Sequence, residues 1–147
     1  MKDLLYLKDE QIKDFIQLLF YAYRETFSDP KKILSKKSFG PAHLRALNLI
    51  ERNPGISLSE IMFKLKITKQ SLNRVLRELI NTKMIKQIKD SDDTRRKNIY
   101  LDKEGQVFFD KVYESQKKRI YHALKTSDPK SVVQFREVLN KIVNGKK

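Results

Sequence analysis

Amide, hydroxyl and guanidinium side chains between residues 69 and 77 could read the edges of nucleic-acid bases. The amides of Gln70 and Asn73 could pair bidentately with adenine, and the guanidinium of Arg74 with guanine. A hydroxyl can bond several bases, whereas lysines and a second arginine are better suited to backbone phosphates. The candidate contact residues of this segment are Lys69, Gln70, Ser71, Asn73, Arg74 and Arg77.

These side chains can contact bases only if they lie on one solvent-exposed face of a helix. Thr68 can cap a helix that begins at residue 69, and its apolar positions form a one-sided stripe: Leu72, Val75, Leu76, Leu79 and Ile80. That stripe would fasten the helix to its own domain and leave the polar face bare. A helix about 10–12 Å across fits the ~12 Å major groove of B-DNA. Just upstream, Ser57 and Glu60 form a capping-box pattern that predicts a short preceding helix.

A second group of charged side chains follows this helix. Residues 84–89 and 98–101 can pair as two short strands, and the eight residues between them are all polar. A basic tip beside a basic helix would widen one anion-binding surface. The candidate residues at the tip are Asp93, Arg95, Arg96 and Lys97.

Positive charge is concentrated over these two segments. The formal net charge is +14, and residues 64–100 hold eleven basic and four acidic side chains, which is half of that excess in 37 residues. Such a placement favours a polyanionic partner, with nucleic acid ahead of an anionic membrane surface. Three alternatives stay open: an ordinary solvated lysine-rich surface, a nonspecific nucleoid-type protein, and a helix-turn-helix used only for protein contacts.

The composition argues against an enzyme. The chain has no cysteine, only two histidines far apart in sequence, and four glycines that form no phosphate-cradling loop. No spacing suggests a metal site, and no cofactor is expected. No segment approaches the ~20 apolar residues of a membrane span, and the N-terminus lacks the features of a signal peptide, so we expect no membrane partner and a cytoplasmic location.

The flanking segments are predicted to be helical. Residues 8–27 have apolar side chains almost all round the helix, which favours packing against a second chain. A polar connector is expected over residues 28–40, then a helix from Pro41 to the turn at Asn53. Asp102 and Asp128 can cap two C-terminal helices. The predicted fold is mostly α with a small β hairpin, in a single domain over residues 1–147.

The order of these elements is that of a winged helix-turn-helix, and residues 67–106 resemble the DNA-binding half of the MarR family of bacterial regulators. The wing pattern of that family is matched by Asp93, Arg95, Leu101 and Gly105 at the expected spacings, with Asp102 in place of a threonine. Residues 52–61 also resemble the loop that leads into the family's third helix.

The resemblance implies a sequence-specific regulator of transcription, most often a repressor. It implies a DNA-binding lobe over about residues 41–101 and a homodimer joined through helices at about 8–27 and 102–144. The operator of such a twofold dimer should be a pseudo-palindrome. Arg95 matches the arginine that enters the minor groove, and Asp93 matches the acid that steadies the wing, with Arg77 as a candidate partner. Arg96 and Lys97 would add phosphate contacts.

Members of the family often bind small aromatic anions and then release DNA. If this chain has such an effector site, its candidates are Tyr21, Tyr23, Phe39, His43, Arg45 and Tyr113. Aromatic residues at helical spacing are more often part of a core, and a histidine at a helix start is more often structural. The sequence therefore names candidates for an effector site without predicting that one exists.

Overall fold

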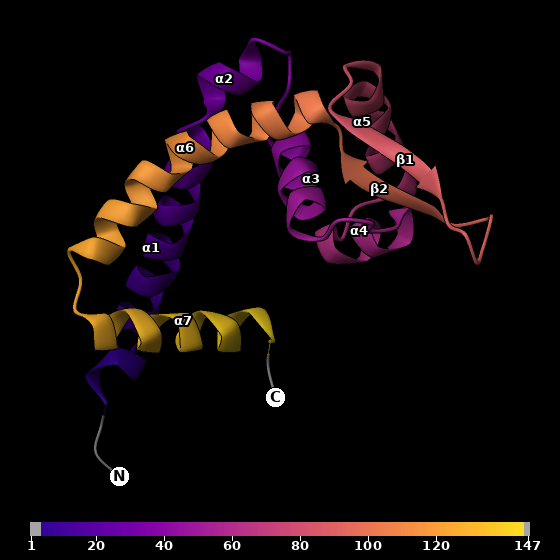
Figure 1. Cartoon of the computed structure of the whole chain (residues 1–147). Coiled ribbons are helices and arrows are strands. Elements are labelled where there is room, and N and C mark those ends of the chain that lie inside the picture. The colour runs from indigo at the N-terminus through magenta and orange to yellow at the C-terminus, as the bar shows by residue number, and fades with distance from the viewer. Residues whose placement is uncertain (1–3, 146–147) are drawn as a thin grey trace. The chain divides into compact units, whose positions relative to one another are not determined.

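Helices dominate the computed structural model, which describes residues 4–145 of the 147-residue chain. A two-stranded hairpin interrupts them, as the sequence predicted (Figure 1). In chain order the elements are η1 (Leu5–Leu7), α1 (Asp9–Ser28), α2 (Lys31–Ser35), α3 (Pro41–Arg52), α4 (Leu58–Leu65), α5 (Lys69–Asn81), β1 (Ile85–Lys89), β2 (Lys97–Leu101), α6 (Lys103–Lys125) and α7 (Pro129–Val143). The described residues form two compact units, one over 27–114 and one made of 4–26 with 115–145.

The unit over residues 27–114 contains the buried hydrophobic core. Helices α3, α4 and α5 pack around it with the hairpin, and the first turns of α6 add aromatic side chains. Burial of this apolar surface is the main force that holds the unit together. The largest side chains with almost no exposed surface are Leu44, Leu47, Ile50, Ile61, Leu72, Leu79, Met84, Ile99 and Val112.

Helix α5 has one face in this core and one in solvent. The Thr68 hydroxyl caps it by accepting the Ser71 N–H at 3.2 Å. Four residues of the predicted stripe are buried, at 72, 75, 76 and 79. The fifth, Ile80, was expected in the stripe but is 40% exposed, because it lies at the edge of the buried face in the last turn of the helix.

The hairpin pairs β1 and β2 in antiparallel register. Ile85 lies opposite Leu101 and Lys89 opposite Lys97, so the connecting tip has seven residues, 90–96, where the sequence predicted eight. Ile99 is fully buried and also bridges to Ile56, which ties the second strand to the segment that leads into α4. The hairpin is therefore fixed to the core at its base and projects from it at the tip (Figure 1).

The segment over residues 28–40 differs from the polar connector that the sequence predicted. It contains the short helix α2, and two of its apolar side chains, Leu34 and Phe39, belong to the core. Pro30 is also almost fully buried. The polar composition was misleading because isolated apolar residues in a lysine-rich segment have no periodicity, and only the tertiary fold shows what they pack against.

The C-terminal helices begin where the sequence placed their caps. Asp128 accepts the Ser131 N–H at 3.3 Å and precedes a helix that starts at Pro129. Asp102 precedes α6, but its carboxylate accepts the adjacent Lys103 N–H at 2.8 Å instead of one farther into the first turn. None of the helices in residues 4–145 is both long enough and apolar enough to cross a membrane.

The unit made of residues 4–26 and 115–145 has no buried side chain among its described residues. Gln116 donates to the Thr26 carbonyl at 3.1 Å, and Arg119 pairs with Glu25 at 3.7 Å, so α1 contacts α6 here. Large apolar side chains are nevertheless exposed along α1 and α7, including Ile16 at 61% and Phe135 at 50%. Within a single chain, the described residues of this unit therefore do not form a buried hydrophobic core.

Candidate nucleic-acid interface

The polar face of α5 lies in solvent. All six side chains that the sequence singled out as candidates on this helix are exposed: Lys69, Gln70, Ser71, Asn73, Arg74 and Arg77. The Ser71 hydroxyl accepts a hydrogen bond from Thr68 at 2.9 Å, which leaves its own hydrogen free to point outward. The buried stripe on the opposite side fixes the rotation of the helix about its axis. All six side chains therefore point into solvent together.

Arg74 is linked to the interior of its unit through two other side chains. Its Nε lies 3.5 Å from Glu78, and the other Glu78 carboxylate oxygen lies 2.6 Å from His43 Nε2. His43 accepts the Gly40 N–H on Nδ1 at 3.0 Å, so its Nε2 carries the hydrogen that it donates to Glu78. Phe39 stacks on the imidazole with ring centroids 4.7 Å apart. His43 is thus a structural residue that holds the partner of a candidate base-reading arginine.

Two glutamates near this surface have lowered pKa values. The hydrogen bond from His43 is the main cause that lowers the pKa of Glu78, and the charge of Arg74 adds to it. The hydrogen bond from Ser57 is the main cause that lowers the pKa of Glu60, and Arg96 adds to it. Both carboxylates are better satisfied in the folded protein than in the unfolded chain.

We expect the folded protein to lose stability in acid through these two groups. Because each pKa is lower in the folded state, the stabilisation is complete above the unfolded value of about 4.3 and is lost as the pH falls through the folded value. Urea unfolding at a series of pH values should therefore show a smaller acid-side loss in Glu78→Gln than in wild type. Equal losses in both proteins would contradict a stabilising role for the Glu78 carboxylate.

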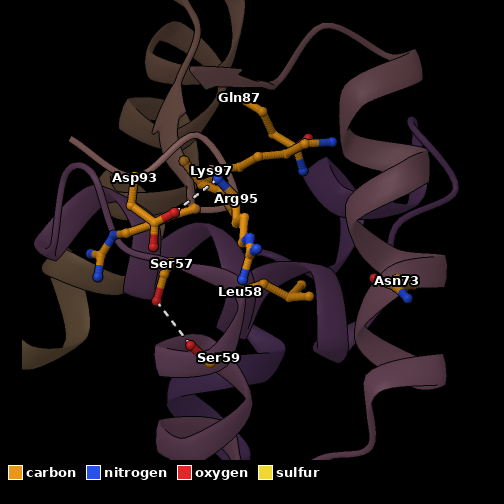
Figure 2. Close-up of a pocket in the computed structure, with 10 residues that line it drawn as sticks. Ser57, Leu58, Ser59, Asn73, Gln87, Asp93, Arg95 and Lys97 are labelled. Carbon is orange, nitrogen blue, oxygen red and sulfur yellow. Dashed lines mark hydrogen bonds between the residues drawn. The ribbon is translucent and has the colours of Figure 1, made fainter. Parts of the chain in front are cut away.

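A groove of about 610 Å³ lies between α5, the start of α4 and the hairpin. Figure 2 shows it with Asn73 on one side and the hairpin residues on the other. It brings Asn73 together with all four hairpin candidates, which are separated from it by about 20 residues of sequence. The lining consists of Ser57, Leu58, Ser59, Asn73, Gln87, Asp93, Arg95, Arg96, Lys97 and Ile99.

The tip of the hairpin is held by its own backbone. Asp93 accepts the Arg95 N–H on its carboxylate and the Arg96 N–H on its carbonyl, both at 3.0 Å. The Asp90 N–H donates to the Arg96 carbonyl at 2.9 Å, and the Asp90 carboxylate accepts the Asp92 N–H. Asp93 thus steadies the tip through main-chain contacts, and among the described residues it forms no ion pair with Arg77, which was the expected partner.

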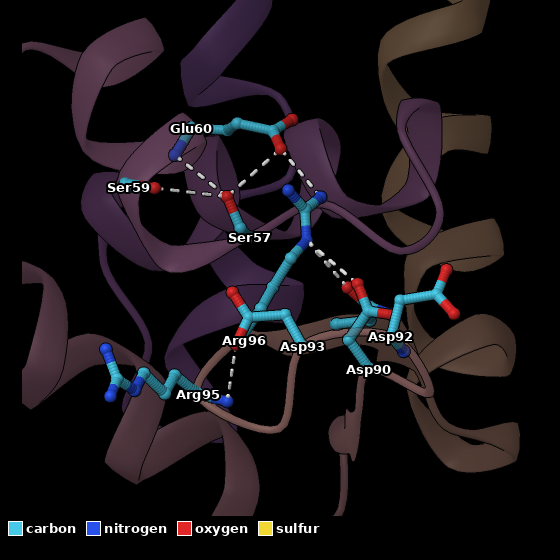
Figure 3. Close-up of polar contacts among 9 residues, drawn as sticks. Ser57, Ser59, Glu60, Asp90, Asp92, Asp93, Arg95 and Arg96 are labelled. Atoms are coloured by element: carbon cyan, nitrogen blue, oxygen red, sulfur yellow. Dashed lines mark hydrogen bonds and ion pairs between the residues drawn. The ribbon is translucent and has the colours of Figure 1, made fainter.

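The two adjacent arginines of the tip have different surroundings. The guanidinium of Arg95 is exposed and has no hydrogen-bond partner within residues 4–145. That of Arg96 contacts Glu60 at 2.8 Å, Asn98 at 3.0 Å and Asp90 at 3.7 Å (Figure 3). Arg95 is therefore available to a ligand, whereas Arg96 already has three acceptors.

The six candidate effector residues do not form one described cavity. Tyr21 and Tyr23 belong to the unit with residues 4–26, whereas the other four belong to the unit over 27–114. Phe39 and His43 contact each other in the core arrangement described above. None of the six lines the groove, whose members come from α4, α5 and the hairpin.

Two acidic residues that matter for the geometry were not among the sequence candidates. Glu60 was recognised only as part of a capping-box pattern; its N–H donates to the Ser57 hydroxyl at 3.2 Å, and its carboxylate accepts from that hydroxyl at 3.0 Å instead of from the Ser57 N–H. For Glu78 the sequence offered one indication: it is the single acidic residue of α5, whose other polar side chains are basic, amide or hydroxyl groups. Neither partner could be identified from spacing, because His43 lies 35 residues from Glu78 and Arg96 lies 36 residues from Glu60.

Comparison with known proteins supports the fold and identifies the family. The model of the MarR family matches residues 38–96. The chain is 37% identical over 141 residues to the HTH-type transcriptional regulator PetP of Rhodobacter capsulatus, and the alignment covers 96% of this chain and 85% of PetP.

Solved structures share the same arrangement of elements. A mutant of MepR from a multidrug-resistant S. aureus isolate is similar with a TM-score of 0.76 at 20% identity, over 88% of this chain and 95% of that one. Streptococcus pneumoniae FabT, solved in complex with DNA, is similar with a TM-score of 0.75 at 13% identity, over 93% of this chain and 96% of that one. These likenesses confirm the winged helix-turn-helix fold.

Proposed function

The chain belongs to the MarR family of DNA-binding transcriptional regulators, and from this premise we propose that it acts as a homodimeric repressor at a pseudo-palindromic operator. The observation that carries the proposal is the continuous polar surface of α5, the groove and the hairpin tip. The regulators of this family are not enzymes, in agreement with the absence of a catalytic motif in the sequence. From here on, α5 is called the recognition helix, and β1, β2 and the tip over 90–96 are called the wing.

We place the recognition helix in the major groove and Arg95 in the adjacent minor groove. The buried stripe holds Gln70, Asn73 and Arg74 outward, where they can reach base edges. A free guanidinium at the wing tip suits a narrow, A·T-rich minor groove, whose negative potential is enhanced. Lys69, Arg77 and Lys97 are exposed around these positions and would contact phosphates. FabT, which shares the fold, was solved in complex with DNA.

The homodimer is supported by the unit that lacks a core. Residues 4–26 and 115–145 bury no side chain in the single chain, yet α1 and α7 expose many large apolar side chains. Many exposed large apolar side chains in one unit are typical of a protein–protein interface. A second copy would cover it and give a twofold dimer, whose two recognition helices should then lie about 34–36 Å apart to fit half-sites one turn apart.

Selection of bound fragments from genomic DNA tests the proposal. The purified protein should enrich fragments that share a palindrome, and its affinity for that palindrome should exceed its affinity for random duplex by roughly 10³ or more at physiological salt. Equal affinities would favour the nucleoid-type alternative instead. A promoter reporter that carries the palindrome should be less active with the protein than without it if the protein is a repressor.

Arg95→Ala should weaken operator binding about tenfold or more without unfolding the protein. The side chain is exposed and unpaired within the described residues, so its loss removes a DNA contact and no internal one. Gel shift for affinity and circular dichroism for folding, on the same sample, check the two halves of the expectation. Arg95→Lys is the matched control that keeps the charge, and it should recover only part of the affinity. Unchanged affinity in Arg95→Ala would refute the minor-groove role.

Arg74→Ala should cost about 1–3 kcal/mol of binding and relax the preference at one base position. Its side chain is 82% exposed, and its guanidinium is held near Glu78, which orients it along the recognition helix. Arg77→Ala on the same helix is the comparison, and it should weaken binding to all sequences alike and reduce the salt dependence. Binding measured against a panel of single-base operator variants separates the two. Uniform weakening by Arg74→Ala would make Arg74 a phosphate contact.

A further inference from the structure

The Arg96 side chain connects two parts of the groove that are distant in sequence. It leaves the wing at residue 96 and ends at the first turn of α4, where its Nη2 lies 2.8 Å from a Glu60 carboxylate oxygen. On its way, the Nε donates to the Asn98 side chain at 3.0 Å and lies 3.7 Å from Asp90 (Figure 3). Within residues 4–145 this is an ion pair between the wing tip and α4, across 36 residues of sequence.

The acceptor at the end of this contact is itself fixed. The Ser57 hydroxyl, in a residue only 6% exposed, donates to the same Glu60 oxygen at 3.0 Å. The Glu60 N–H in turn donates to the Ser57 hydroxyl at 3.2 Å, so two hydrogen bonds join these residues and hold the carboxylate at the start of α4. A lowered pKa of Glu60 agrees with a carboxylate that stays charged in this position. The arginine therefore contacts a preorganised acceptor and not a mobile surface acid.

We propose that Arg96 and Glu60 form a clamp that fixes the wing relative to α4 and so sets the position of the neighbouring Arg95 over the groove. Arg96 is then a positioning residue, not a phosphate contact, and Glu60 takes part in DNA binding without touching DNA. The inference rests on the proposed function, because its consequence for affinity presupposes that the groove and wing bind DNA.

Simple electrostatics and the clamp predict opposite results for Glu60. Removing a negative charge beside a polyanion should by itself strengthen binding or leave it unchanged. If Glu60 holds the wing, Glu60→Gln should instead weaken binding. The Ser57 hydroxyl caps α4 by accepting the backbone N–H of residue 60, which glutamine keeps, so this substitution leaves α4 capped and removes the charge. The sign of the change therefore separates the two explanations.

The experiment is a double-mutant cycle on operator affinity. Glu60→Gln and Arg96→Gln should each weaken operator binding by roughly 3- to 30-fold, and the double variant should be no weaker than the worse single variant. Asp92→Asn is the charge-matched control, because Asp92 is an exposed acid at the same tip whose carboxylate contacts neither Arg96 nor Glu60 among the described residues. This control should bind as tightly as wild type or more tightly.

The alternative has a distinct signature. If Arg96 contacted a phosphate, Arg96→Gln would lower the slope of log affinity against log salt by about 0.9, and Glu60→Gln would bind as tightly as wild type or more tightly. Either result overturns the clamp. The clamp would also be overturned if the losses of binding free energy in the two single variants added up in the double variant. Either single substitution already breaks the Arg96–Glu60 contact, so the second should cost little more.

A measurement on the free protein separates this proposal from the proposed function. The chain has no cysteine, so Ser91→Cys at the wing tip and Lys64→Cys on α4 can carry two spin labels without background. The distance distribution between the labels should be narrow with Arg96 and Glu60 intact and broader in Glu60→Gln or Arg96→Gln. Identical widths would overturn the clamp even if the protein binds its operator, and broadening would support it even if no operator were found.

Discussion

Replacing Leu76 with alanine should lower the free energy of unfolding by about 2–5 kcal/mol. Leu76 is 2% exposed and lies in the middle of the stripe that seats the recognition helix on the core. The truncation removes apolar atoms from the core and leaves a cavity that the neighbouring side chains cannot fully close. Urea unfolding followed by circular dichroism measures the loss of stability. The Leu76→Ala protein should also bind DNA more weakly than wild type at temperatures close to its lowered thermal unfolding midpoint.

Ile80→Ala is the matched control for this prediction. Leucine and isoleucine have the same atoms, and both positions lie on the same helix, but Ile80 is 40% exposed. Its truncation removes less buried surface and should cost under about 1 kcal/mol. If Ile80→Ala were as costly as Leu76→Ala, the two side chains would share one buried interface in the folded protein. The structural assignment of Leu76 to the buried face of α5 and of Ile80 to its exposed edge would then be wrong.

Gly105→Ala is expected to destabilise the protein, although helix propensity alone predicts the reverse. Gly105 is the third residue of α6, and in a helix interior alanine is favoured over glycine by about 1 kcal/mol. Here a Cβ at position 105 would lie 1.8 Å from the Met84 carbonyl oxygen and 2.7 Å from its carbon. These are backbone atoms, and that oxygen already accepts the Asp102 N–H at 2.9 Å, so it cannot move aside without breaking a contact.

The expected loss for Gly105→Ala is about 3 kcal/mol, at the upper end of the usual cost of overpacking, because the obstacle is main chain. Gly40→Ala provides the control, since nothing lies within 4 Å of a Cβ there. That change should alter stability by less than about 1 kcal/mol. Thermal unfolding of both variants gives the comparison. A stabilised Gly105→Ala protein would show that α6 can separate from the strand base at no cost.

The local features of this chain were readable from its sequence. The capping residues Ser57, Thr68 and Asp128 act where the pattern placed them, and Pro41 opens α3. The exposed face of α5 and the hairpin also followed from the pattern. Capping and periodicity involve residues three or four positions apart, so the sequence displays them directly.

The features that depend on distant residues were not readable in this way. Leu34 and Phe39 belong to the core even though their segment is polar, and Asp93 secures the tip by accepting the Arg95 and Arg96 backbone N–H groups instead of pairing with Arg77. The two neighbouring arginines of the wing look equivalent in the sequence. Only the fold shows that Arg95 is unpartnered within the described residues, whereas Arg96 contacts Glu60.

The sequence by itself therefore determined the helix-turn-helix, the direction in which its polar face points, and the sign of its charge. The tertiary structure decided which of the basic and acidic side chains are free to bind a ligand and which are engaged in the protein. The physical reason is the range of the interactions. A helical stripe needs only its own periodicity, but the Arg96–Glu60 and His43–Glu78 contacts and the close approach of Gly105 to Met84 require segments far apart in the chain to meet.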